Sequence, residues 1–251
     1  MKEIAREQKL PGESKMNIYN MKNTMDAEAK RQEVIARNLA ASQRPGYKAD
    51  ILVQQRFDKM MRGSEDLSPA ANARIDFTQG PLKTTGRTLD FGLQGDGFFE
   101  VQNSKGEAFF TRAGDFHLNS DGNLVTNEGY FLSSSEGRLS VGLTDKVEDL
   151  RISSDGVLSL GGRVLGKMKL VAPDESRLER AGESYFRLPP RETAPLARDL
   201  KVVGGTLEMS NTSAISQMVH MIDSVRQYEL ASKFIKNGAE LGQSEQRTFG
   251  G

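Results

Sequence analysis

Few side chains in this sequence have the types and spacing that chemistry requires. Asn119, Asp121 and Asn123 have the one-three-five spacing of a calcium-binding loop. Such a loop also needs a glycine at its sixth position and a glutamate at its twelfth, where this chain has Leu124 and Tyr130. The spacing therefore predicts a polar turn and no calcium site.

Two glycine motifs match nucleotide-binding fingerprints only in part. Gly95-Asp96-Gly97 begins like a dinucleotide fingerprint, but Glu100 stands at the third glycine position and a strand is expected to follow. Gly166-Lys167 is followed by Met168, which lacks the hydroxyl of a P-loop. We expect a β-turn at residues 95–97 and no cofactor.

The side chains needed for catalysis and for metal binding are scarce. The chain has no cysteine, which excludes disulfides, thiolate zinc sites and a cysteine nucleophile. No serine elbow accompanies either of its two histidines, His117 and His220, and both are expected at the surface or in helix packing. The sequence predicts no catalytic residue, no metal site and no enzyme.

Charge and hydropathy exclude further classes. The 251 residues carry 34 Lys and Arg against 34 Asp and Glu, without the basic surplus that nucleic-acid binding needs. No apolar run approaches the roughly 20 residues of a membrane span. Residues 1–15 lack an apolar core, so we expect no cleavable secretory signal.

Glycine distribution indicates the fold class. Residues 1–60 contain two glycines, whereas residues 80–166 contain 15 of the 25. Because glycine is costly within helices and favoured in turns, the chain is expected to run helix, glycine-rich antiparallel β domain, helix. The predicted class is α+β.

Apolar residues at spacings of three and four predict amphipathic helices near both ends, over residues 17–41 and 214–239. Pro45-Gly46 follows the first helix, and Ser213 is a plausible N-cap for the second. If the two helices pair as a coiled-coil-like arm, much apolar surface stays uncovered. Neighbouring copies would cover that surface, which is typical of a polymer subunit.

The middle predicts short strands joined by tight turns. A helical or extended piece is expected at 50–63, a polar loop at 64–73, a first strand at 75–80 and a late strand at 163–171. Hairpin signals in between are Ser104-Lys105-Gly106, Ala113-Gly114-Asp115, Ser120-Asp121-Gly122-Asn123, Asn127-Glu128-Gly129 and Asp155-Gly156. The expected segments are a disordered extension 1–15, an N-terminal helix 16–48, an extended linker 49–74, the β domain 75–205, a C-terminal helix 206–241 and a flexible tail 242–251.

Several segments resemble the bacterial flagellar basal-body rod proteins, in the order that this family has them. Residues 18–48, closing on Pro45-Gly46-Tyr47-Lys48, resemble the N-terminal rod motif, with departures at Gln32, Arg37 and Arg44. The β-domain signatures of the family are matched by LQGDGFFEV (93–101), FTRAGDFHLNSDGNLVTNEGY (110–130) and ISSDGVLSL (152–160). Residues 205–211, GTLEMSN, resemble its C-terminal motif.

The resemblance implies a structural, non-enzymatic rod subunit that polymerises into a hollow shaft transmitting torque from motor to hook. It implies self-association, contacts with other rod and hook axial proteins, export by the flagellar type III apparatus without a cleavable signal, and a periplasm-spanning location. Periplasmic ring proteins are further candidate partners, while nucleic acid and membrane insertion are not expected. The residues expected at the assembly interface are Ile18, Met21, Met25, Ile35, Asn38, Leu39, Ile215, Met218, Ile222, Val225, Tyr228 and Ile235.

Within the family, the short chain and the divergent SQRPGYK junction (residues 42–48) favour a proximal rod protein of the F type. The distal rod type G is the next candidate, followed by a hook-type axial protein. An alternative from a different class is a binding module whose β domain holds a glycan or a ring protein.

Overall fold

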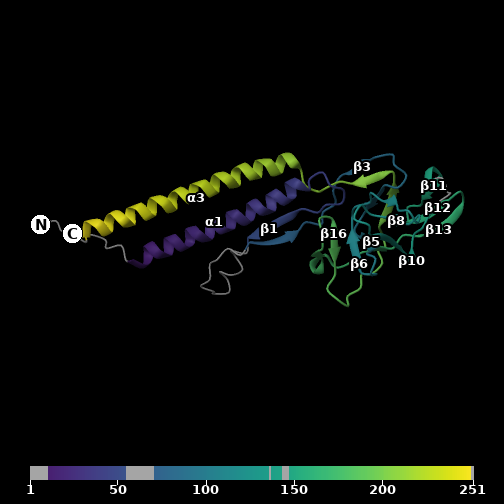
Figure 1. The fold of residues 1–251 in the computed structure, drawn as a ribbon, viewed down its shortest axis with the longest axis horizontal. Helices are drawn as coiled ribbons and strands as arrows, with labels where there is room; N and C mark the ends of the chain where they lie inside the picture. The colour runs from purple at the N-terminus through teal and green to yellow at the C-terminus, as the bar shows by residue number, and fades with distance from the viewer. Residues whose placement is uncertain (1–10, 55–70, 136, 143–146, 250–251) are drawn as a thin grey trace. The chain divides into compact units, whose positions relative to one another are not determined.

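The computed structural model describes residues 11–54, 71–135, 137–142 and 147–249, which divide into two compact units. The first unit contains helix α1 (Pro11–Ala40) up to Leu39, strands β1 (Asp50–Gln54) and β2 (Ala71–Ile75), and helix α3 (Ala214–Phe249) from Ile215 (Figure 1). The second contains residues 40–49 and 76–214. Residues 40–49 thus belong with the β-rich unit, although the sequence groups them with the N-terminal helix.

Helix α1 begins at Pro11, before the predicted start near Asn17. Proline is well tolerated in the first turn of a helix, because the backbone N–H groups there have no partner within the helix. Residues 11–15 are therefore helical rather than part of a disordered extension, and residues 1–10 lie outside the described part. The helix ends at Ala40, close to the predicted end.

Helix α3 begins at Ala214 as predicted but continues to Phe249, beyond the predicted end near Ala239. The tail expected to be flexible from Gly242 is thus helical as far as Phe249. A glycine weakens a helix by about 1 kcal/mol without removing its backbone hydrogen bonds, and no proline follows to end the helix.

Strands β1 and β2 pair antiparallel, with Asp50 opposite Ile75 and Gln54 opposite Ala71. They replace part of the linker expected over residues 49–74. The strand predicted at 75–80 is wrong, because β2 ends at Ile75 and residues 76–81 lie outside the strands. The Asp76 N–H bonds to the carbonyl of Ala49, but the Thr78 N–H bonds to the Asp76 carboxylate, so Thr78 N–H does not join a strand ladder.

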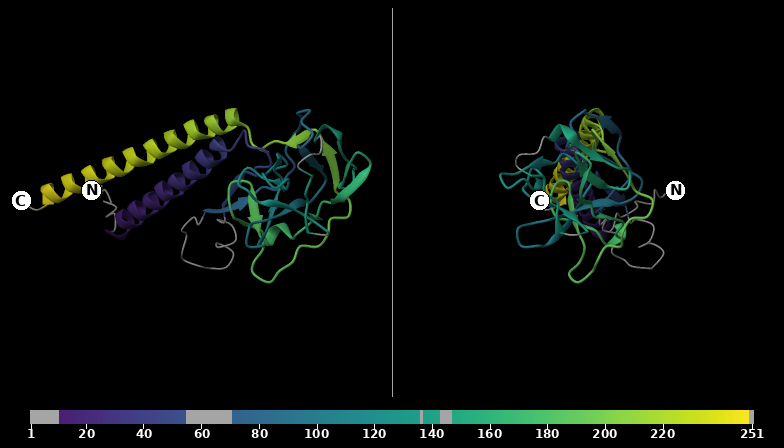
Figure 2. Two further views of the ribbon diagram at one scale, coloured as in Figure 1. Left: turned by 45° about the vertical axis from the view of Figure 1, so that its right-hand side comes forward. Right: turned by 90° about the vertical axis from the view of Figure 1, so that its right-hand side faces the viewer.

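The second unit is built from short antiparallel strands (Figures 1 and 2). Its largest sheet joins nine of the described strands in the order β15-β16-β6-β5-β9-β8-β7, with β10 on β9 and β14 on β5. Smaller sheets pair β11-β12-β13, β17-β4 and β18-β3. The strand bounds are β3 (Leu82–Thr84), β4 (Phe91–Gln94), β5 (Phe98–Gln102), β6 (Ala108–Thr111), β7 (His117–Leu118), β8 (Leu124–Val125), β9 (Phe131–Ser134), β10 (Gly137–Arg138), β11 (Leu150–Ile152), β12 (Val157–Leu160), β13 (Arg163–Lys167), β14 (Leu170–Val171), β15 (Glu179–Arg180), β16 (Tyr185–Arg187), β17 (Lys201–Gly204) and β18 (Thr206–Glu208). Short 3-10 turns occur at Val147–Asp149 and Glu175–Arg177.

Most of the predicted hairpins are confirmed. Antiparallel pairs β5–β6, β7–β8, β8–β9 and β11–β12 flank the turns at residues 104–106, 120–123, 127–129 and 155–156. The predicted strand at 163–171 is divided into β13 and β14.

The segment Ala113-Gly114-Asp115 is not a hairpin, contrary to prediction. It connects β6, which pairs with β5 and β16, to β7, which pairs with β8. The carbonyl of Gly114 accepts from Phe91 N–H at 3.0 Å, and a Cβ at residue 114 would stand 1.8 Å from the Phe91 carbonyl oxygen. Glycine is therefore present because two backbone segments meet here, not because the chain reverses.

One hydrophobic core supports the second unit. Phe99 and Phe116 are fully buried at its centre, with edge-to-face rings whose centroids are 5.5 Å apart. Other members of the core include Phe91, Leu93, Val101, Leu124, Leu132, Leu139, Leu158 and Met168. The observed class is α+β, with mainly antiparallel sheets and two long helices. Among the helices of the described residues, none combines the length and the hydropathy of a membrane span.

Candidate functional site

The residues of α3 expected at an assembly interface are exposed in the isolated chain. Side-chain exposure ranges from 36% at Tyr228 to 76% at Ile215, with Met218, Ile222 and Val225 in between. Three large apolar residues outside the predicted stripe are also exposed: Val219, Leu230 and Phe234. Exposed apolar side chains concentrated on one helix indicate a surface that another protein covers. The side chain of Ile235 lies outside the described set.

The residues of α1 predicted for the same interface have different environments. Ile35 and Asn38 are buried within the chain, and Met25 and Leu39 are half-buried. The amide of Asn38 donates to the Asp50 carbonyl at 2.8 Å and accepts from Asp50 N–H at 2.9 Å. Asn38 thus fastens the end of α1 to the start of β1. The side chains of Ile18 and Met21 lie outside the described set.

Polar residues occupy the buried side of α3. Gln217 and Ser224 are buried, and the Ser224 hydroxyl donates a 2.9 Å hydrogen bond to Glu28 Oε2 on α1. An amphipathic helix in a water-soluble monomer normally has the reverse pattern, with apolar residues buried and polar residues outside. The distribution on α3 is that of a helix with further apolar contacts to make.

A buried ionic network marks where residues 40–49 meet the segment before α3. The Glu208 carboxylate, with no exposed surface, accepts from Lys48 Nζ at 2.8 Å, from Gly80 N–H at 3.0 Å and from Arg112 at 3.0 Å. Lys48 also donates to the Thr78 carbonyl at 2.7 Å. Burial lowers the pKa of Lys48 from its ordinary value, against the opposing effect of the Glu208 charge.

Backbone contacts complete this junction. Gly46 N–H donates to the Glu208 carbonyl at 2.8 Å, and Ala49 N–H donates to Asn211 Oδ1 at 2.8 Å. Gly46 has a φ of +65°, and a Cβ there would stand 2.1 Å from the Ala113 nitrogen. The Pro45–Lys48 and Gly205–Asn211 motifs are therefore in direct contact, and only glycine fits at residue 46, where the backbone passes close to Arg112 and Ala113.

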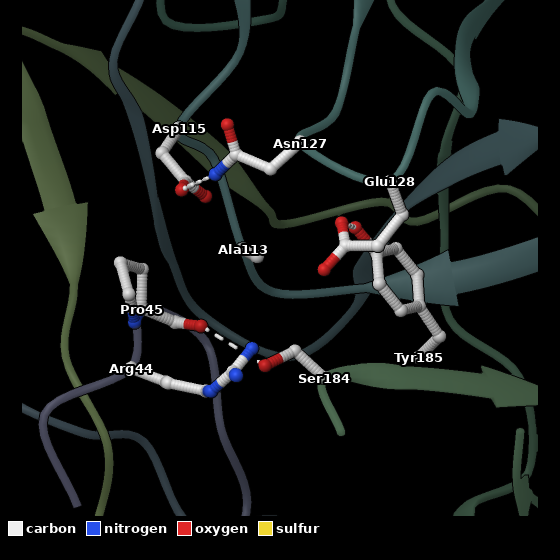
Figure 3. A pocket seen from close by; sticks show the side chains of 8 residues that line it. All are labelled: Arg44, Pro45, Ala113, Asp115, Asn127, Glu128, Ser184 and Tyr185. Carbon is white, nitrogen blue, oxygen red and sulfur yellow. Dashed lines mark hydrogen bonds between the residues drawn. The ribbon is translucent and has the colours of Figure 1, made fainter. Parts of the chain in front are cut away.

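A half-open cavity of about 190 Å³ lies beside this junction. Figure 3 shows Asp115 with Asn127 on one wall and Glu128 with Tyr185 on another. Asn127 donates to Asp115 at 2.6 Å, and the Tyr185 hydroxyl donates to Glu128. Burial raises the pKa of Asp115, and the same effect raises that of Tyr185. The phenol of Tyr185 thus stays protonated.

The chemical motifs of the sequence have structural explanations. Asn119 Oδ1 accepts from the N–H groups of Asp121 and Asn123, so the calcium-like spacing is that of a side-chain-capped turn. Gly95-Asp96-Gly97 forms a bend that connects β4 to β5, in place of the predicted β-turn. His117 and His220 are exposed. No group of three or more metal-ligating side chains is found in the part of the chain that the structure describes.

Two flagellar family models match segments of this chain. The family described as "Flagellar hook protein FlgE/F/G D1 domain" matches residues 92–160, within the β-rich unit. The family described as "Flagellar basal body rod FlgEFG protein C-terminal" matches residues 203–247, which include β18 and most of α3.

Curated relatives extend the match over most of the chain. The flagellar basal-body rod protein FlgF of Caulobacter vibrioides is 30% identical over 226 residues, which cover 87% of this chain and 91% of the relative. This chain belongs to the flagellar basal-body rod protein family. Rod protein FlgF of Escherichia coli is 29% identical (88% of this chain, 92% of the relative), and rod protein FlgG of Agrobacterium fabrum is 30% identical (86% and 93%). The chain is accordingly a structural rod subunit, from a family of structural proteins.

Two junction residues of this rod protein, Arg112 and Glu208, were not predicted as site residues from the sequence. Both lie in segments whose resemblance to the family was noted, FTRAGDF and GTLEMSN. A charged residue inside each motif was the available signal, but sequence order gives no reason to bring the two together.

Proposed function

We propose that this rod protein assembles by packing one apolar surface of α3 against neighbouring axial subunits. The α3 face is defined by Ile215, Met218, Ile222, Val225 and Tyr228. Its support is a single observation: these side chains are more than a third exposed on a helix whose buried side is polar. Ile18, Met21, Met25 and Leu39 of α1, together with Ile235, are proposed to contribute to the same interface.

Burying the α3 face in a subunit contact supplies enough free energy to drive association. Full burial of a Val, Leu, Ile or Met side chain is worth about 1.5–3 kcal/mol relative to exposure. Four such positions and Tyr228, each already partly shielded, amount to several kcal/mol before the entropy of association is subtracted. Repetition of the contact at every subunit favours a polymer over an isolated dimer.

The proposed arrangement has α1 and α3 paired as a coiled-coil-like arm that carries the β-rich unit. Neither helix is stable alone in water without a packed face. The Ser224–Glu28 hydrogen bond supports their pairing because it joins two buried polar groups, one from each helix. The arms are proposed to build a hollow shaft that transmits torque to the hook, with the β-rich units around it.

Partners and location follow from this role. We expect self-association, contacts with other rod and hook axial proteins, and delivery by the flagellar type III export apparatus. The proposed location is the periplasm-spanning rod, near the periplasmic ring proteins. We propose the proximal F type because the junction at residues 42–48 is divergent. The distal G type is the alternative, since the FlgF and FlgG relatives have similar sequence identities to this chain.

Substitution on the α3 face tests the proposal. Val225→Asp would place a carboxylate in an apolar contact at a cost of about 3 kcal/mol, or about a hundredfold in association. Sedimentation of purified full-length chain would measure assembly, and motility would measure it in cells. Gln227→Asp adds the same group at another exposed position of α3 and is the matched control.

We expect Val225→Asp to block assembly and Gln227→Asp to permit it, with near-ultraviolet circular dichroism of the β-rich unit unchanged in both. Normal assembly of Val225→Asp would refute the proposal. Unfolding of the β-rich unit by this change would show that Val225 belongs to an internal core.

A further inference from the structure

The cavity beside the junction, in the β-rich unit, is lined by two carboxylates and one guanidinium. Asp115 and Glu128 lie on different walls (Figure 3). The guanidinium belongs to Arg44, which is already paired with Glu183. The two carboxylates are therefore the charges that an incoming group would meet.

Both carboxylates accept from uncharged donors. Asn127 donates to Asp115, and the Tyr185 hydroxyl donates to Glu128. An ionised carboxylate has about four acceptor positions, so each can bind further donors. Within the described residues neither carboxylate forms an ion pair. Their negative charge is therefore not compensated by a neighbouring cation.

A third carboxylate adds to this charge. Asp90 pairs with Asp115 in an isolated antiparallel bridge and is 1% exposed. Neither of its carboxylate oxygens has a hydrogen-bond partner among the described residues, and Arg87, 3.6 Å away, has a side chain that is 62% exposed. Burial raises the pKa of Asp115, and the charges of Glu128 and Asp90 raise it further. A cation entering the cavity would relieve this repulsion.

The volume of the cavity limits what can enter. The cavity's 190 Å³ exceeds the roughly 10–15 Å³ that one water molecule needs and falls short of the roughly 300–1,000 Å³ of sites for drug-sized ligands. One side chain is therefore a suitable occupant. A guanidinium suits two carboxylates best, because it is weakly hydrated and carries five N–H donors in one plane.

An exposed arginine on a closed turn is present in the same unit. Pro190 and Arg191 form the turn, which a 3.2 Å hydrogen bond from Glu192 N–H to the Pro189 carbonyl closes. Arg177 binds the Glu192 carboxylate and so anchors the turn. The guanidinium of Arg191 makes no hydrogen bond or ion pair within the described part of the chain.

The backbone of Arg191 indicates that its side chain is needed. Its φ is +74°, and every other described residue with a positive φ is a glycine. Glycine would adopt this conformation without strain, so a long side chain here is typical of a functional contact. Arg191 does not line the cavity of its own chain, and its entry into such a cavity would require a second copy.

We propose that Arg191 of one copy enters the cavity of the next copy and binds between Asp115 and Glu128. The inference rests on the proposed function, because it requires neighbouring copies in the rod. Every copy presents one Arg191 and one cavity, so the contact is head-to-tail and repeats from subunit to subunit. The charge-assisted hydrogen bonds of the guanidinium fix the orientation of the two copies.

Arg191→Gly tests the contact without straining the fold. Because glycine adopts a φ of +74° readily, the β-rich unit of the full-length variant should resist urea at least as well as that of the parent chain. Incorporation into basal bodies, measured by immunoblotting in a strain that lacks the parent chain, should fall by about tenfold or more, as expected for a lost charge-assisted contact. Arg198→Gly changes another exposed arginine of the same segment and should incorporate normally.

Normal incorporation of Arg191→Gly would overturn the proposal. Reduced incorporation together with lower resistance to urea would show that Arg191 supports the fold, and would overturn it as well. The α3 face is tested separately by Val225→Asp. Normal incorporation of Arg191→Gly removes only the cavity contact, whereas normal assembly of Val225→Asp removes only the α3 contact.

Charge reversal identifies the partner of Arg191. Arg191→Glu and Glu128→Lys should each lower incorporation. A chain that carries both changes should recover it, because every contact again joins opposite charges. A double variant that incorporates no better than the weaker single variant would refute the pairing.

Discussion

Ser224 Oγ lies 2.9 Å from Glu28 Oε2, although 196 residues separate them in the sequence. Both side chains are buried, and Arg31 lies 3.7 Å from the other oxygen of Glu28. A buried polar pair between two helices satisfies its own hydrogen bonds only in one alignment. It therefore specifies the register in which α1 and α3 meet.

Ser224→Ala should weaken the packing of α3 on α1 by about 1–3 kcal/mol, because it leaves the Glu28 carboxylate buried without its donor. Amide exchange along both helices would measure the loss. The double change Ser224→Ala, Glu28→Leu should recover much of it while relaxing the register. An additive result for the two changes would show that the residues do not interact.

Gly46→Ala should destabilise the β-rich unit by more than the 1–3 kcal/mol typical of backbone strain, because strain and clash both apply. The added Cβ meets the Ala113 nitrogen at 2.1 Å, and φ is +65°. Gly161→Ala is the control, since Gly161 has a φ of +55° and open space around it. Urea unfolding followed by near-ultraviolet circular dichroism would compare them. Equal losses would mean that the contact with Ala113 relaxes freely.

Stability should depend on pH through Asp115. Burial raises its pKa in the folded chain, and the nearby charges of Glu128 and Asp90 act in the same direction. The folded chain thus binds more protons than the unfolded chain between the two pKa values, so this group makes the free energy of unfolding fall as pH rises. The loss of folding stability caused by Asp115 is absent at pH values below the ordinary aspartate pKa of about 3.9. It is complete at pH values above the raised pKa that Asp115 has in the folded chain.

Asp115→Asn removes this titration. The free energy of unfolding of the variant, minus that of the parent chain, should therefore increase as pH rises from about 4. Urea unfolding at a series of pH values would measure the difference, in which the other carboxylates cancel. A difference that does not change with pH would show that Asp115 titrates alike in both states.

Local signals account for the features that the sequence predicted well. The end of α1 follows from Pro45-Gly46, and the hairpins at 120–123 and 127–129 follow from their turn residues, because these preferences act within a few residues. One failure occurred where distant backbone decided the outcome. Gly114 looked like a turn glycine, but it is required by contact with Phe91.

The sequence by itself determined the α+β class, the absence of thiol chemistry, the presence of one helix near each end and the family, since each depends on composition, periodicity or ordered motifs. Tertiary structure alone decided that Lys48 meets Glu208, because contacts between segments 160 residues apart are encoded by no local preference. It also decided which side of α3 is buried. Helical periodicity identifies an apolar stripe, but only packing shows that Ser224 faces inward while Ile222 stays exposed.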